Sequence, residues 1–115
     1  MSESILISTK KILGIEADYK AFDLDILTHI NSAFNTLSDL GLGPEEGFMI
    51  EDEQATWGDF LEKDKRLNSV RTYIYLKVRL LFDPPTTSFA ITAFEKQVSE
   101  LEWRLNVYRE GRDHG

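Results

Sequence analysis

Apolar residues recur at intervals of three and four along most of the chain, a spacing that places them on one face of an α-helix. Four segments show this pattern, and we predict helices over about 4–13, 23–40, 67–82 and 88–108. The predicted core positions are Ile5, Leu6, Thr9, Ile12 and Leu13 in the first segment, Ile26, Leu27, Ile30, Ala33, Phe34, Leu37 and Leu40 in the second, Leu67, Val70, Ile74, Val78 and Leu81 in the third, and Ile91, Phe94, Val98, Leu101, Leu105 and Tyr108 in the fourth.

Residues suited to helix capping stand at the edges of these segments. Ser4 fits the N-cap of the first helix, Asp23 that of the second, and Thr87 or Ser88 that of the fourth, because each side chain can accept a bond from a free backbone N–H. Gly14 fits the left-handed residue that ends the first helix.

The sequence Asp83-Pro84-Pro85 ends the third helix, because proline lacks an N–H and moves the residue before it away from helical angles. The third and fourth helices are therefore joined by a short connection and should pack antiparallel. We predict a mainly α fold, a single domain over 1–115. It is a small four-helix bundle with one long helical hairpin and a flexible polar tail over 110–115.

Residues 41–62 break the helical pattern and form an extended loop. Two structures fit it. Residues 48–50 and 55–57 can pair as a short β-hairpin, or Thr56 can cap a single helical turn that carries Trp57. Loops of this length inside a compact helical domain often have a function.

Composition narrows the class of protein. Of the 115 residues, 42% are hydrophobic and 29% charged, as in an ordinary globular domain. The chain has no cysteine, which excludes disulfides, thiolate metal sites and cysteine nucleophiles. No apolar run approaches the ~20 residues of a membrane span, and no basic segment precedes the first apolar stretch, so we expect a protein made in the cytoplasm without processing.

The net charge of −7 argues against tight DNA binding, since such binding depends on neutralising phosphates. A negative surface does suit a wall that DNA must slide past.

No catalytic motif is present. His29 falls on the polar face of the second predicted helix and is expected to be solvated. A group of acids in the loop (Asp52, Glu53, Asp59 and Glu62) raises the alternative of a metal-dependent nuclease or hydrolase. Their spacing does not match a calcium loop, and charge runs usually mark solvated chain. We expect no enzyme activity, no metal and no cofactor.

Trp103 lies off the apolar stripe of the fourth predicted helix, which makes it a candidate anchor for a partner. The alternative is that Trp103 packs under the long loop, against Trp57 or Phe48. The apolar residues that we expect at subunit or partner interfaces are Trp103, Val107, Phe48, Met49, Ile50 and Trp57.

Several segments together resemble the head–tail connector (adaptor) proteins of tailed bacteriophages. They are YIYLKVRLLFDPP at 73–85, ELEWRLNV at 100–107, FDLDI at 22–26 with HIN at 29–31, GLGP at 41–44 and ATW at 55–57. The similarity covers nearly the whole chain.

The resemblance implies a ring of about twelve copies beneath the portal of the DNA-filled capsid, in the neck of the virion. Such a ring extends the DNA channel, lets the genome pass without sequence-specific binding, and docks a stopper or tail completion protein. It implies no enzymatic activity and no membrane. The other function that we keep is a small helical adaptor or regulator that binds another protein as a monomer or dimer.

A ring needs head-to-tail contacts between two different faces of each subunit. We also predict that the end of the fourth helix and the tail dock onto the portal, since this polar segment carries several arginines suited to charged recognition. The residues expected in that contact are Arg104, Asn106, Tyr108, Arg109 and Arg112.

Overall fold

The computed structural model describes the backbone of residues 3–61 and 65–114, and the side chains of 3–61 and 65–106. The helices over these residues are α1 (Ile5–Ile12), α2 (Asp23–Asp39), α3 (Trp57–Phe60), α4 (Leu67–Phe82) and α5 (Ser88–His114). The same residues contain no β-strand, only an isolated bridge between Ser4 and Thr56. The prediction of a mainly α fold is confirmed. None of the helices in the described part is long and apolar enough to cross a bilayer.

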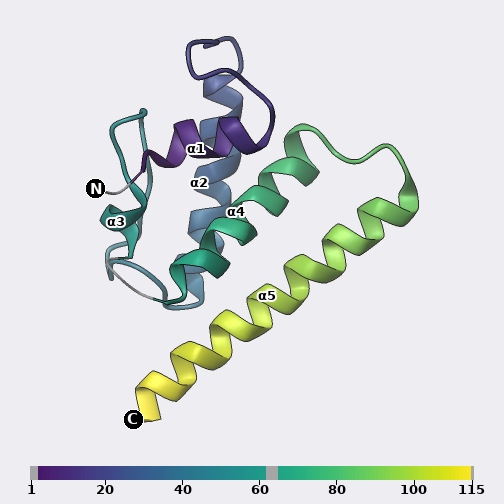
Figure 1. Ribbon diagram of the computed structural model, residues 1–115. Helices are drawn as coiled ribbons and strands as arrows, with labels where there is room; N and C mark the ends of the chain where they lie inside the picture. The colour runs from purple at the N-terminus through teal and green to yellow at the C-terminus, as the bar shows by residue number, and fades with distance from the viewer. Residues whose placement is uncertain (1–2, 62–64, 115) are drawn as a thin grey trace.

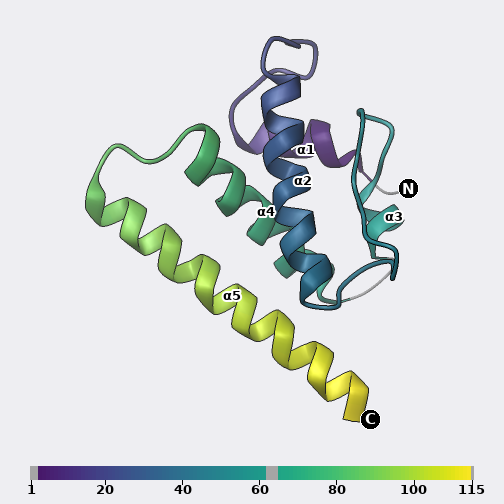
Figure 2. The ribbon, with the colours of Figure 1, turned by 180° about the vertical axis from the view of Figure 1, so that it is seen from behind.

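The helices are arranged around the packed pair α2 and α4 (Figure 1). The short helix α1 contacts both of them, and α5 packs against α4. Helices α4 and α5 run in opposite directions, joined by residues 83–87, and α5 continues past the start of α4 at its C-terminal end (Figures 1 and 2).

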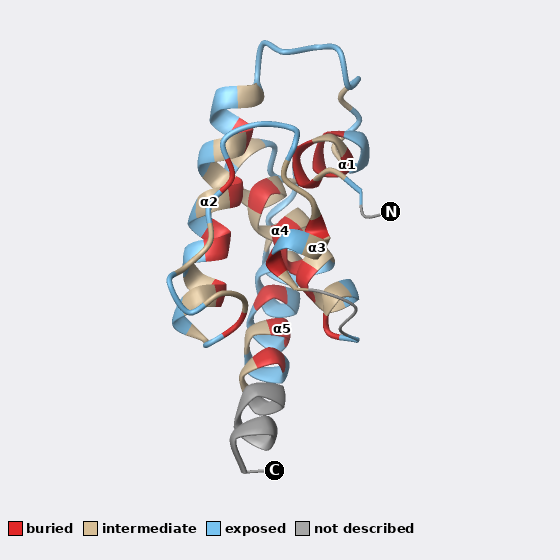
Figure 3. Ribbon diagram, turned by 90° about the vertical axis from the view of Figure 1, so that its left-hand side faces the viewer, coloured by how far each residue is buried: buried red, intermediate tan, exposed pale blue. Residues whose placement is uncertain are grey.

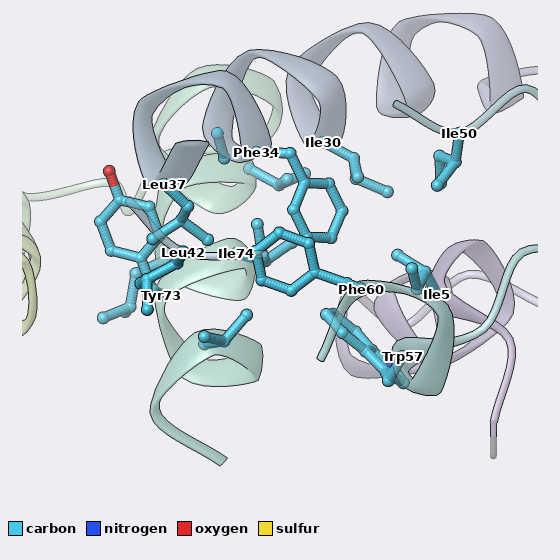
Figure 4. Close-up of a cluster of buried hydrophobic side chains, with 14 of the residues drawn as sticks. Ile5, Ile30, Phe34, Leu37, Leu42, Ile50, Trp57, Phe60, Tyr73 and Ile74 are labelled. Atoms are coloured by element: carbon cyan, nitrogen blue, oxygen red, sulfur yellow. The ribbon is translucent and has the colours of Figure 1, made fainter. Parts of the chain in front are cut away.

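The core fills the space between α1, α2 and α4 and extends to one side of α5 (Figures 3 and 4). The α2 stripe is as predicted, with its central residues fully buried. Two predicted core residues are wrong: Ile12 is 51% exposed and Leu81 is 53% exposed. Both lie in the last turn of their helices, at the margin of the packed region. On α4, Tyr73 and Leu76 are buried together with Val70, Ile74 and Val78 of the predicted stripe.

Two predicted N-caps are confirmed. Ser4 Oγ accepts a hydrogen bond from the Ile7 N–H at 3.2 Å, and Thr87 Oγ1 accepts one from the Ala90 N–H at 3.1 Å. Each bond satisfies a backbone donor that a helix start leaves free.

Asp23 was predicted as the N-cap of α2, and this is wrong. Phe22 occupies that position without a side-chain bond, and Asp23 Oδ1 instead accepts from Lys10 Nζ at 2.7 Å. Lys10 is 0% exposed, and its ammonium also donates to the carbonyls of Ala17 at 3.2 Å and Tyr19 at 2.6 Å. A buried cation must be paired, and this need takes the carboxylate from the helix end. The three bonds fix the turn between α1 and α2.

Gly14 ends α1 as predicted, with a φ of +81°. The Gly14 N–H donates to Lys11 O at 3.1 Å and the Ile15 N–H to Lys10 O at 2.8 Å, the bonding of a Schellman motif. At the other end of the chain, α5 continues to His114 instead of ending near 108. Residues 109–114 lack proline, three of the six (Arg109, Glu110 and Arg112) are good helix formers, and Gly111 costs only ~1 kcal/mol in a helix. Most of the segment predicted as a tail therefore has a helical backbone.

The long loop contains the single helical turn and not the β-hairpin. Thr56 and Asp59 form a capping box at the start of α3, and the Thr56 N–H donates to Asp59 Oδ2 at 2.8 Å. Because each residue satisfies a backbone donor of the other, this helix is stable although it is only one turn long.

Candidate functional site

Trp57 belongs to the core. Its side chain is 3% exposed, and its Nε1–H donates to Ser8 Oγ at 2.8 Å. The Arg71 guanidinium lies over its ring, 5.3 Å from the centroid. Trp57 was predicted to face a partner, but in the folded chain it joins α3 to α1 and α4 and offers almost no surface.

The neighbouring segment 48–50 alternates between core and solvent. Ile50 is buried, and its backbone is bonded on both sides by Asn31, whose Oδ1 accepts from the Ile50 N–H at 2.8 Å and whose Nδ2 donates to Ile50 O at 2.9 Å. The half-buried Phe48 ring lies 4.9 Å from that of Phe34, centroid to centroid. Met49, between them, is 72% exposed. Of the four loop residues predicted for an interface, Met49 is the most exposed, Phe48 is half-buried, and Ile50 and Trp57 have almost no surface.

The role of Asn31 was not predicted. It lies beside the apolar stripe of α2, where a polar residue is normally taken as solvated. Its amide matches one donor and one acceptor of an irregular backbone segment, so it holds the loop against α2. Nothing in the local pattern indicates a partner 19 positions away along the chain.

Trp103 is 70% exposed on α5, so the alternative that it packs under the long loop is wrong. Its orientation follows from its neighbours: Leu101 and Leu105 are buried against the core, and Glu102 accepts a hydrogen bond from the Tyr73 hydroxyl at 2.6 Å. In Figure 4 that hydroxyl points out of the apolar cluster. These contacts fix the rotation of α5 and direct Trp103 away from α4.

The bond between Tyr73 and Glu102 also changes the acidity of the phenol. Burial first, and then the hydrogen bond and negative charge of Glu102, raise the pKa of Tyr73 well above its ordinary value. The phenol therefore stays protonated and serves as a donor that ties α4 to α5.

The residues predicted for portal docking lie at the C-terminal end of α5. Arg104 is exposed and Asn106 half-buried. The side chains of Tyr108, Arg109 and Arg112, and that of Val107, lie outside the described residues, while their backbone continues the helix.

The loop acids do not converge on one point. The Asp52 carboxylate accepts from the Gln54 N–H at 2.8 Å, Glu53 pairs with Lys20 at 3.4 Å, and Asp59 caps α3. Glu62 lies outside the described residues. Over the described part of the chain, no three His, Asp or Glu residues are grouped to hold a metal ion. The acids that are described stabilise turns and pair at the surface.

A comparison with known protein families gives a match. The family model described as "Phage connector protein" matches residues 5–112, which span α1 to α4 and nearly all of α5. No curated protein and no solved structure matches the chain significantly.

Proposed function

The chain belongs to the phage connector protein family, and from this membership we propose that it is a structural subunit of the head–tail connector of a tailed phage. About twelve copies form a ring beneath the portal, in the neck of the virion. The ring extends the DNA channel and docks the stopper or tail completion protein. The observation that carries the proposal is the family match over 5–112.

The shape of α5 supports docking onto the portal. Its helical backbone continues to His114 and runs past the start of α4 (Figures 1 and 2). The C-terminal end of α5 thus reaches beyond the α4–α5 hairpin. Arg104, Asn106, Tyr108, Arg109 and Arg112 belong to this end of the helix and form the proposed portal contact.

A second contact involves the long loop. Phe48, Ile50 and Trp57 hold the loop against the core, and Met49 projects from it with 72% of its surface exposed. We assign Met49 to a contact with a neighbouring subunit or with the stopper. Replacing Met49 with serine is then expected to weaken assembly and leave the stability of the monomer unchanged.

The charge of the chain suits a DNA channel. With −7 per subunit, a ring of about twelve copies carries a strongly negative total charge. Acidic residues that face the lumen repel phosphates, so the genome passes without adhering.

Docking is tested by mixing the full chain, or a chain truncated after Leu105, with purified portal rings of the same phage. Sedimentation velocity should show a ring-sized complex with the full chain and none with the truncated one. Circular dichroism of the truncated chain checks that its core is folded. If the truncated chain forms the same complex, the docking proposal is wrong. If the full chain binds as one or two copies only, the small adaptor function is favoured instead.

A further inference from the structure

Helix α5 carries a second stripe on the side turned away from its buried residues. Its members are spaced by three and four, so they lie in one line along the helix. All are exposed, and the two aromatic residues at its ends are the most prominent, Phe89 at 85% and Trp103 at 70%. The outer stripe consists of Phe89, Ala93, Lys96, Glu100 and Trp103.

A groove lies between α4 and α5 on a different side of the hairpin. Its volume is ≈ 480 Å³. Its apolar wall includes Leu80, Leu81 and Ile91, and its charged residues are Lys77, Glu95 and Glu102. The groove is available because no described residue of α5 before Val98 is fully buried, and Phe94 is the one apolar residue among them that packs against the core.

We propose that the outer stripe of one copy lies in the groove of the next copy, and that this contact repeats around the ring. This inference rests on the proposed function, which supplies the ring, and adds the two surfaces that meet. Aromatic side chains of the stripe fill the apolar part of the groove. At ~100° per residue, the stripe and the α5 residues of the groove lie roughly 140° apart around the helix, so the two surfaces face different ways.

Charge favours a second copy as the occupant. The stripe carries Lys96 and Glu100, and the groove offers Glu95 and Lys77. Among the described residues, none of these four has a salt bridge or side-chain hydrogen bond within its own subunit. Each of these charges can therefore pair with a charge of opposite sign on the other surface, Lys96 with Glu95 and Glu100 with Lys77, and such complementarity sets the register of a contact.

The separation of the surfaces determines the kind of assembly. A two-fold dimer joins one surface to itself, whereas two different surfaces join head to tail, which gives a closed ring when the rotation between copies divides a full turn. With 27 residues, α5 is about 40 Å long, so the contact can run along much of the hairpin. Head-to-tail contact also leaves the C-terminal end of α5 free for the portal.

Cysteine cross-linking tests this contact directly, because the natural chain has no cysteine. Ala93→Cys marks the stripe and Leu81→Cys marks the groove, both at exposed positions. The double variant, concentrated or bound to portal rings and then oxidised, should give a ladder of dimers, trimers and larger species. The two single variants mixed together should give dimers only, and each single variant alone should give none.

Charge reversal gives a second measurement. Lys96→Glu should weaken assembly about tenfold, and Glu95→Lys in the same chain should restore much of it. The inference is wrong if a single variant cross-links to itself, or if rings form while the double variant gives no ladder. In the latter case the connector function still stands, because the rings exist. Absence of any ring on the portal contradicts the connector function itself.

Discussion

The two tryptophans should separate folding from assembly. Trp57 is 3% exposed and Trp103 is 70% exposed, so Trp57→Ala should destabilise the monomer and Trp103→Ala should not. For assembly we expect the opposite result: Trp103→Ala should weaken it, because of the two tryptophans only Trp103 is exposed to a partner. The two substitutions delete the same side chain and serve as controls for each other.

The magnitude follows from the contacts of Trp57. Truncating a buried tryptophan to alanine costs about 3–5 kcal/mol, out of the ~5–15 kcal/mol that stabilises a typical domain. The loss includes the hydrogen bond to Ser8, the contact with Arg71 and the packing against Phe34. For a domain of this size the melting temperature should fall by roughly 15–30 °C. Trp57→Phe keeps an aromatic ring but loses the bond to Ser8, and should cost about 1–2 kcal/mol. Trp103→Ala should change stability by less than ~0.5 kcal/mol.

Urea unfolding followed by circular dichroism measures these differences as shifts of the midpoint. Fluorescence adds an internal check, because the chain has only two tryptophans and each variant keeps one. The variant that retains Trp57 should emit at shorter wavelength than Trp57→Phe, in which the exposed Trp103 is the emitter. If Trp57→Ala unfolds at the same urea concentration as the natural chain, the assignment of Trp57 to the core is wrong. If Trp103→Ala is equally destabilised, its assignment to the surface is wrong.

Four further substitutions probe the fold. The pKa of Tyr73 is raised in the folded chain, so its contribution to stability is complete below the ordinary value of about 10 and is lost as the pH rises beyond it. Tyr73→Phe should therefore reduce the loss of stability between pH 9 and 11 (roughly the range in which free phenols ionise), as measured by urea midpoints. Lys10→Met leaves Asp23 and two backbone carbonyls without their donor and should cost about 3 kcal/mol by thermal unfolding; an unchanged melting temperature contradicts the role of this buried cation. Gly43→Ala should destabilise more than Gly47→Ala in the same assay: both have positive φ, of +80° and +93°, but only at Gly43 would the added methyl overlap an aromatic ring. Equal losses would contradict this packing.

Local sequence was sufficient to predict the parts of the fold that depend on residues within a few positions of one another. These parts are the α2 stripe, the caps at Ser4 and Thr87, and the end of α1 at Gly14. The Asp23 prediction failed because Lys10, 13 residues away, competes for its carboxylate. No local pattern carries that information.

The candidate interface residues also divide into those predicted from local sequence and those that depend on distant contacts. Trp103 was identified as lying off a helical stripe, and such an argument needs only the period of the helix. Trp57, Ile50 and Phe48 lie in a loop without a period, so their burial depends on contacts with α1 and α2 made far along the chain. Sequence patterns alone therefore could not predict that these three side chains pack against the core.

The most direct test of the connector function is cryo-electron microscopy of phage particles assembled with this chain and of particles assembled without it. The account predicts a ring of density between the portal and the tail, into which the α4–α5 hairpin fits, and the absence of that ring and of infectivity when the chain is missing. Infectious particles with an unchanged neck in the absence of the chain would contradict it.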